Sequence, residues 1–289
     1  MADNSRAINR VFTRKVISDL VQDGKSDVFD YVVKRYVEDP SGKTHGQLIS
    51  EIYTRLNQQQ RNEYFYMNTL LNKLLCGIHN VNTTVAFSQV RIEHSIADFV
   101  MINGEGCVYE IKSDLDNFSR LHNQLQDYFC AFNKVSVLAS IHEQEKVRDV
   151  LSSFGEMGEA VGIYVLSEQG TIFSKERSKE PVEYNANLRH SSIFKLLRKK
   201  EYESVLKEYF GFVPETDPVF HFRVCLEKFE EIPILEAQHL ALQEMKKRSK
   251  ITVEQFGKIR PELKAVVYFS NLEKQTPMLN QLLDTPYRR

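Results

Sequence analysis

The sequence predicts a mixed α/β protein that ends in a mainly helical region. Three observations lead to this prediction. Apolar residues recur at helical spacing up to residue 78, and short β-rich runs separated by turn residues follow from residue 83. From residue 190 onward the spacing is again mainly helical. Between these regions the elements follow the order α-β-β-β-α-β and then α-β, which is typical of a mixed sheet covered by helices.

The expected elements follow from changes in hydrophobic period. Residues 5–38 read as one or two short helices, because Val11, Val16 and Leu20 recur at helical spacing, and a turn at 39–42 follows. Further helices are expected at 45–57, 60–78, 116–132, 143–154, 191–210, 217–230, 233–249 and 252–257. Strands are expected at 83–90, 96–102, 107–112, 135–141 and 160–166. Residues 176–188 are polar and contain proline, which predicts a linker or a long loop.

The chain is long enough for one large domain or two smaller ones, with 289 residues. The pattern predicts three parts. Residues 1–44 form an N-terminal helical segment, 45–175 form the mixed α/β core, and 176–289 form a mainly helical C-terminal region. The last part contains local basic clusters, and a charge run of this kind is more often a solvated helix face than a phosphate contact.

Composition sets limits on the class of protein. The net charge is −1, so any contact with nucleic acid must come from local patches. The four cysteines are scattered without the spacing of a zinc site, which suits a reducing compartment. The sequence has neither the apolar core of a signal peptide nor a run long enough to cross a membrane. We therefore expect a cytoplasmic protein with no membrane partner.

Five polar residues form the pattern D-x11-E-I-K-x11-Q-x3-Y, namely Asp98, Glu110, Lys112, Gln124 and Tyr128. The Asp lies on one predicted strand, and Glu-x-Lys lies on the next, ahead of a predicted helix. Because side chains alternate along a strand, the Glu and the Lys point to the same face. This order places two carboxylates and an ammonium at one edge of the sheet.

Two neighbouring carboxylates repel each other at neutral pH unless a cation lies between them. Oxygen ligands of this kind suit Mg²⁺ or Mn²⁺, and the backbone carbonyl of Ile111 could add a further ligand. Such a metal polarises a phosphate and generates hydroxide from bound water. Lys112 would orient that water or stabilise the charge on the phosphate. The alternative is a solvated Glu–Lys ion pair, which is common on strand edges.

Two further features support a site. Asp116, Arg120, Gln124 and Tyr128 are spaced four apart, so they would share one face of the predicted helix, although a polar stripe is usually a solvated face. Glu63 begins an otherwise apolar helical stripe and could reach the same metal. The alternative is that Glu63 lies near a helix N-terminus because the helix dipole favours it there.

These residues resemble the PD-(D/E)xK nuclease superfamily, and in particular its RecB-type branch, which pairs Asp and Glu-x-Lys with a Gln-x3-Tyr helix. The match covers roughly residues 60–141. The wording VYEIKSDLDNFSRLHNQLQDY also resembles an uncharacterised bacterial family with an "sce"-prefixed label. The resemblance implies a restriction-endonuclease-like αβββαβ core. One departure is Ala97, which stands where the nominal motif has proline.

The resemblance also implies roles for single residues. Asp98 and Glu110 would bind the metal, Lys112 would be the catalytic lysine, and Glu63 would match a glutamate of the first helix that often binds metal. Gln124 and Tyr128 would position the nucleic acid or support the metal site, with Arg120 on the same face. The cluster of cysteines that holds iron and sulfur in some RecB-type nucleases is not expected, because only Cys225 lies late in the chain.

The resulting hypothesis is a nuclease that depends on Mg²⁺ or Mn²⁺ and hydrolyses phosphodiester bonds, with DNA favoured over RNA. A role in phage defence or on a mobile element is an association of bacterial proteins of this sort. The alternative is a catalytically silent, nuclease-like module that binds DNA or protein. The C-terminal helices would then contact a substrate, a partner protein or another copy of the chain. Endonuclease and exonuclease activity both stay open.

Overall fold

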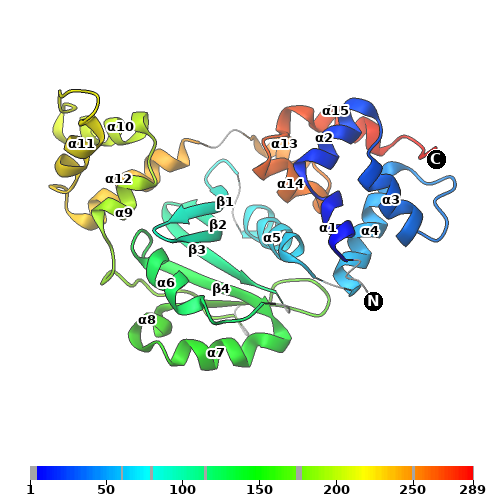
Figure 1. The fold of residues 1–289 in the computed structure, drawn as a ribbon, viewed down its shortest axis with the longest axis horizontal. Coiled ribbons are helices and arrows are strands. Elements are labelled where there is room, and N and C mark those ends of the chain that lie inside the picture. Colours follow the sequence, from blue (N-terminus) through cyan, green and yellow to red (C-terminus); the bar gives the residue numbers. More distant parts are fainter. Residues whose placement is uncertain are drawn as a thin grey trace. The chain divides into compact units, whose positions relative to one another are not determined.

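The structure of this protein is a computed structural model that describes residues 5–59, 61–78, 81–113, 116–173, 178–248 and 251–288. The chain divides into two units, each of which is described by itself (Figure 1). The first unit is discontinuous and comprises Met1–Val81, Glu168–Thr171 and Ile251–Arg289. The second unit comprises Asn82–Ser167 and Ile172–Lys250. No helix within the described ranges has the length and apolar character needed to cross a membrane.

The first unit is helical and joins the beginning of the chain to its end. Its helices are α1 (Ser5–Val11), α2 (Arg14–Asp23), α3 (Asp27–Tyr36), α4 (His45–Gln59), α5 (Glu63–Asn72), the π-helical η1 (Lys73–Ile78), α13 (Val253–Gly257), the short 3-10 turns η3 (Pro261–Leu263) and η4 (Glu273–Gln275), α14 (Lys264–Phe269) and α15 (Thr276–Leu283). The buried Asn68 links them, because its amide donates to Pro261 O at 2.9 Å and its carbonyl accepts from Ala265 N at 2.9 Å. Buried amides need such partners.

The second unit is built on one mixed sheet of five strands in the order β1-β2-β3-β4-β5. The strands are β1 (Val85–Ile92), β2 (Ser95–Asn103), β3 (Glu105–Lys112), β4 (Lys134–Ser140) and β5 (Gly162–Leu166). The pairs β1–β2 and β2–β3 are antiparallel, whereas β3–β4 and β4–β5 are parallel. The parallel pairs need helical crossovers, which α6 (Leu121–Phe129) and then α7 (Gln144–Ser152) with α8 (Gly155–Ala160) supply after β3 and β4. The 3-10 turn η2 (Ile141–Glu143) leads into α7.

Four helices complete the second unit. They are α9 (His190–Lys195), α10 (Lys199–Phe210), α11 (His221–Phe229) and α12 (Ile234–Lys246). Side chains from these helices and from α6 share one apolar core with the strands; examples are Val100, Val108, Leu125, Phe229 and Leu242. The helix α12 contacts β2 and β3 directly. The predicted helical C-terminal region is therefore, over residues 190–246, part of the unit that contains the sheet.

The mixed α/β class predicted from the sequence is confirmed, and a strand is present at each of the five expected places. The expected helix 116–132 is shorter, because α6 begins only at Leu121. Asp116 Oδ2 accepts hydrogen bonds from the backbone N and the hydroxyl of Ser113, and Asn117 Oδ1 accepts from Ser119. Side chains of this type compete with helical hydrogen bonds and hold the segment in turns.

The unit boundaries also differ from the three predicted parts. The first unit continues past residue 44 to Val81 and resumes at Ile251, so that 45–175 is not one unit by itself. Residues 178–184, in the expected linker, run beside the sheet, where Lys179 forms a bridge with Ile163 and Tyr184 N donates to Asn133 O. Hydrophobic period reports which residues are buried, but it does not report which distant segments bury them.

The contact of α12 with the sheet yields a stability prediction. A Cβ built on Gly106 of β3 would lie 3.0 Å from Leu242 Cδ2, so this helix approaches the strand closely. Leu242→Ala should lower the free energy of unfolding by about 2–5 kcal/mol, because it leaves a cavity there. Leu235→Ala, on the same helix but with a side chain that is 49% exposed, should change it by less than about 0.5 kcal/mol. Urea unfolding followed by circular dichroism measures both, and equal effects would contradict this packing.

Candidate active site

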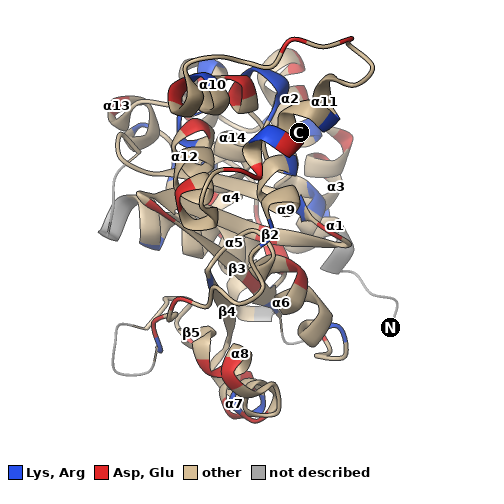
Figure 2. Cartoon of the chain, turned by 90° about the vertical axis from the view of Figure 1, so that its left-hand side faces the viewer, with Lys and Arg blue, Asp and Glu red and all other residues tan. Residues whose placement is uncertain are grey.

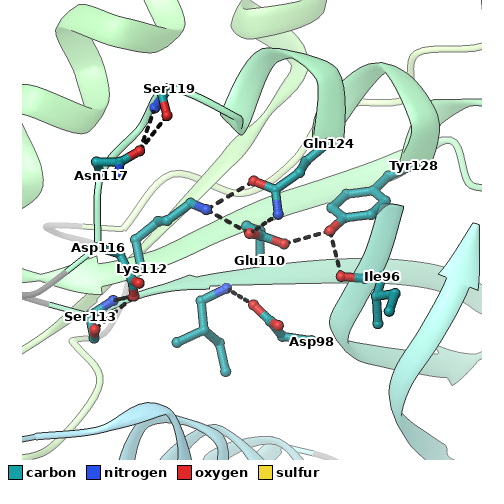
Figure 3. Close-up of polar contacts among 11 residues, drawn as sticks. Ile96, Asp98, Glu110, Lys112, Ser113, Asp116, Asn117, Ser119, Gln124 and Tyr128 are labelled. Atoms are coloured by element: carbon teal, nitrogen blue, oxygen red, sulfur yellow. Dashed lines mark hydrogen bonds and ion pairs between the residues drawn. The ribbon is translucent and has the colours of Figure 1, made fainter. Parts of the chain in front are cut away.

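The polar residues predicted from the sequence converge where β3 faces α6 (Figure 3). Glu110 and Lys112 alternate on β3 with Ile111, so both point toward the side on which α6 lies. Gln124 and Tyr128 are one helical turn apart on α6 and point back at them. Residues separated by 18 positions in the chain thus meet in one cluster.

The carboxylate of Glu110 is the centre of this cluster. Its Oε1 accepts hydrogen bonds from Lys112 Nζ at 2.7 Å and from Gln124 Nε2 at 2.6 Å. Its Oε2 lies 2.6 Å from the hydroxyl of Tyr128. Glu110 is only 2% exposed and Lys112 6%, so this ion pair lies almost out of water. A buried charge of this kind is stable only when it is paired and hydrogen-bonded.

The amide of Gln124 serves both charges of the ion pair. Its nitrogen donates to Glu110, and its oxygen accepts from Lys112 Nζ at 2.9 Å. The three side chains therefore close a ring of hydrogen bonds in which every donor faces an acceptor. An amide has a donor at one end and an acceptor at the other, so it fits this place, whereas a carboxylate or an ammonium would not.

Asp98 lies beside the cluster, where β2 separates from β3. The ladder between these strands ends at the pair Phe99 and Tyr109. Beyond it, the backbone N of Ile111 donates to Asp98 Oδ2 at 2.8 Å and not to a strand carbonyl. Because N–H and C=O of one strand residue lie on the same edge, the carbonyl of Ile111 also faces the side of Asp98.

Burial and the negative charge of this region raise the pKa of the Tyr128 hydroxyl. It lies 2.9 Å from Ile96 O as well as 2.6 Å from Glu110 Oε2, so its one proton has two acceptors. Burial, and then the charge of Glu110, raise the pKa of Tyr128 well above its ordinary value, and the charge of Asp98 adds to this effect. Tyr128 is therefore a neutral donor at physiological pH.

The oxygen atoms fit a hard divalent cation. A carboxylate offers roughly four lone-pair sites, and the three hydrogen bonds on Glu110 leave one for a metal. Mg²⁺ is commonly held by one or two carboxylates together with water. Asp98 and Glu110 could supply the carboxylates, and Ile111 could add its carbonyl. Among the residues that the structure describes, no group of three or more His, Cys, Asp or Glu side chains could hold a metal ion. The set is therefore limited to two carboxylates.

The remaining predicted residues lie outside this cluster. Arg120 is exposed and precedes the first turn of α6, and Asp116 lies in the preceding turn, so the expected four-residue stripe reduces to Gln124 and Tyr128. Glu63 belongs to the first unit, where it is exposed in the first turn of α5. That place fits the helix-dipole interpretation. A role for Glu63 as a metal ligand stays a prediction.

One contact that supports the site, made by Asp127, was not predicted from the sequence. Asp127 Oδ2 on α6 accepts from Ser95 Oγ, at the start of β2, at 2.7 Å and from His94 N, in the turn before it, at 3.2 Å. These bonds attach the end of α6 to the strand that carries Asp98. A single Asp in a helix gives no signal of this role, because its partners are more than 30 positions away.

The cysteines with described side chains are Cys107, Cys130 and Cys225. All three are free and buried. Burial raises the pKa of Cys107 to about 12 and also raises the pKa of Cys130 and Cys225. They therefore stay protonated at neutral pH, and the thiolate is the reactive form.

The fold and the site define a mixed α/β protein with a buried carboxylate, lysine and amide cluster beside a second carboxylate. The chain belongs to the bacteriophage P4 protein cII family, whose model matches residues 56–275. This range contains the whole sheet, the cluster and α9 to α12. Comparisons with curated proteins and with solved structures give no match.

Tyr128→Phe tests the energetics of the cluster. The change removes the hydroxyl whose proton lies between Glu110 Oε2, which is buried, and Ile96 O. The free energy of unfolding should fall by about 1–3 kcal/mol, the cost of leaving such groups without a donor. Tyr209→Phe is the control, because that side chain is 39% exposed, and it should be neutral within about 0.5 kcal/mol. Urea unfolding gives both values, and a neutral Tyr128→Phe would mean that the phenol is not needed.

Proposed function

We propose that this protein is a metal-dependent nuclease that hydrolyses phosphodiester bonds, with DNA as its substrate. The observation that carries the proposal is the buried ring of Glu110, Lys112 and Gln124, with Asp98 next to it on the neighbouring strand. The order α5-β1-β2-β3-α6-β4 supports a restriction-endonuclease-like core of the PD-(D/E)xK superfamily. The pairing of Gln124 and Tyr128 with the Glu-x-Lys strand supports its RecB-type branch.

The residues would divide the work as follows. Asp98, Glu110 and the Ile111 carbonyl would hold Mg²⁺ or Mn²⁺, which when bound polarises the phosphate and lowers the pKa of water. Lys112 cannot be a ligand while it is an ammonium, so its role is to orient the attacking water or to neutralise the charge that develops on the phosphate. Gln124 fixes the direction of Lys112, and Tyr128 holds the Glu110 carboxylate in one orientation by donating to it.

The biological setting is part of the same proposal. The family to which the chain belongs takes its name from a protein of bacteriophage P4. This name supports a role in phage or mobile-element biology, with phage defence as one form of it. DNA is preferred to RNA on the resemblance to RecB-type nucleases, since the chemistry at the phosphate is shared by both.

One observation favours a second candidate function, a silent nuclease-like module that binds DNA or protein. Glu110 is 2% exposed and already accepts three hydrogen bonds, so the cluster is satisfied without a metal. A buried ion pair with this many hydrogen bonds could be kept for the fold alone. Metal binding separates the two candidates, because only the nuclease needs it.

Lys112→Ala separates catalysis from metal binding. Cleavage of linear, circular and single-stranded DNA in Mg²⁺ or Mn²⁺ should fall by roughly 100- to 1000-fold, because charge on the phosphate is no longer stabilised. Mn²⁺ affinity, measured by calorimetry, should be largely retained. Glu110→Ala is the companion variant and should lose both, and EDTA should stop the wild-type reaction. Absence of Mn²⁺ binding in the wild type would support the silent module.

Two variants on α6 test the position of the helix. Gln124→Ala should lower the rate of cleavage by roughly 10- to 100-fold, because it removes the amide that holds Lys112 and Glu110. His122→Ala is the matched control, since its ring packs on Phe154 with centroids 4.7 Å apart and does not contact the cluster. Circular dichroism checks that both variants fold. Equal losses of activity would show that Gln124 has no special role.

A further inference from the structure

A second feature of the second unit is the connection between α10 and α11. These helices run parallel, because Glu203 meets His221 near their N-terminal ends and Phe210 lies under Lys228 near their C-terminal ends. Two parallel helices cannot be joined by a tight turn. The segment Gly211–Phe220 must therefore run back along the full length of the pair (Figure 1).

This return segment and the start of α11 expose large apolar side chains. Val219 is 83% exposed, Phe212 53%, Phe220 48% and Phe222 46%. We call these four residues the α11 apolar surface. Single exposed apolar residues are ordinary, but four large ones lie here on one loop and the first turn of the helix that follows it. Large exposed apolar patches are common at interaction sites in soluble proteins.

Local hydrogen bonds hold Val219 and Phe220 in their exposed positions. Asp217 Oδ1 accepts a hydrogen bond from Val219 N at 2.9 Å, and Asp217 O accepts one from Phe220 N at 2.9 Å. Two prolines, at positions 214 and 218, flank residues 215–217 and restrict the backbone further. The carboxylate of Asp217 thus fixes a turn that presents Val219 and Phe220 to solvent. The surface is ordered before any partner arrives, which lowers the entropy cost of binding.

The return segment and α11 carry mostly negative charge, and the nearby Lys199 of α10 is paired with Glu203 at 3.8 Å. Residues 208–236 contain seven acidic side chains, all exposed, and two basic ones, which gives a net charge of −5. The acidic residues are Glu208, Glu215, Asp217, Glu227, Glu230, Glu231 and Glu236. Figure 2 shows acidic positions along the segment that joins α10 to α11.

The two basic side chains in this range are already engaged. Lys228 pairs with Glu231 at 2.6 Å and lies 4.1 Å from the ring centre of Phe210. Arg223 pairs with Glu227 at 3.6 Å and lies over the ring of Phe220. They neutralise part of the surface but leave five negative charges without a basic side chain from this range.

The combination of acidic and apolar side chains favours one of three possible kinds of bound partner. A nucleic acid would bring phosphates against an acidic rim, and phosphate binding depends on Lys and Arg. A second copy of the chain would bring the same acidic rim against itself, and like charges across an interface cost binding energy. A segment with both basic and apolar side chains satisfies the whole surface.

We propose that the α11 apolar surface is a docking site for a positively charged, amphipathic segment of another protein. Its apolar side chains cover Phe212, Val219 and Phe220, and its Lys or Arg residues pair with carboxylates such as Glu215. Apolar burial supplies the affinity, and the charges supply the rate and the choice of partner. The proposal does not depend on nuclease activity.

The test uses the full chain and two synthetic helical peptides with the same leucine face. One peptide carries lysine on its polar face and the other carries glutamate. Fluorescence anisotropy should show binding of the lysine peptide that weakens as salt is added, and no binding of the glutamate peptide. Val219→Ser should weaken binding of the lysine peptide by roughly tenfold or more. Val182→Ser, in the same unit with a side chain 60% exposed, should leave it unchanged.

Other results would overturn the proposal. Equal binding of both peptides, or equal effects of Val219→Ser and Val182→Ser, would show that the surface does not select a basic partner. A dimer in light scattering that Val219→Ser abolishes would make a second copy the occupant. Duplex DNA binding lost in Val219→Ser would make nucleic acid the occupant. A further variant, Glu215→Lys, should weaken the lysine peptide without affecting the fold, since Glu215 is exposed.

Discussion

The burial of the Glu110 carboxylate is the constraint on which the site depends. A charge removed from water must find partners, and three donors meet this one: an ammonium from its own strand, and an amide and a phenol from α6. For this to happen α6 must cross the sheet at a fixed height and rotation. The contacts of Asp127 with His94 and Ser95 attach the same helix to the start of β2. The buried carboxylate and these contacts together fix the placement of α6 against β2 and β3.

The change in strand direction within the sheet places a second carboxylate next to this cluster. Up to β3 the strands are antiparallel neighbours, and from β3 onward they are parallel and need helical crossovers. Where β2 leaves β3, the ladder stops, and the side chain of Asp98 takes the hydrogen bond that a strand would have taken. A second carboxylate and a backbone carbonyl edge are thereby brought beside Glu110. The same geometry serves a metal-dependent nuclease or a fully satisfied structural cluster, and metal affinity distinguishes them.

The second unit therefore combines two polar or apolar features of different character, one buried and one exposed. The cluster on β3 and α6 is polar, buried and internally paired, whereas the α11 apolar surface is exposed and surrounded by carboxylates. Of the C-terminal helices, α12 covers the sheet, whereas α11 carries the exposed apolar side chains on which the docking proposal rests.

The sequence by itself determined the mixed α/β class, the five strands, and the grouping of Asp98, Glu110, Lys112, Gln124 and Tyr128. It could do so because strand and helix periods are local, and because alternation places Glu110 and Lys112 on one face. Helical spacing predicted too early a start for α6. The side chains of Asp116 and Asn117 form local hydrogen bonds that hold this segment in turns, although its spacing is helical. Only the tertiary structure decided that residues 190–246 share the core of the sheet, that Gln124 binds both charges, and that Asn68 ties the early helices to the last ones. Those outcomes rest on contacts between distant segments, and distant contacts leave no periodic trace in a single sequence.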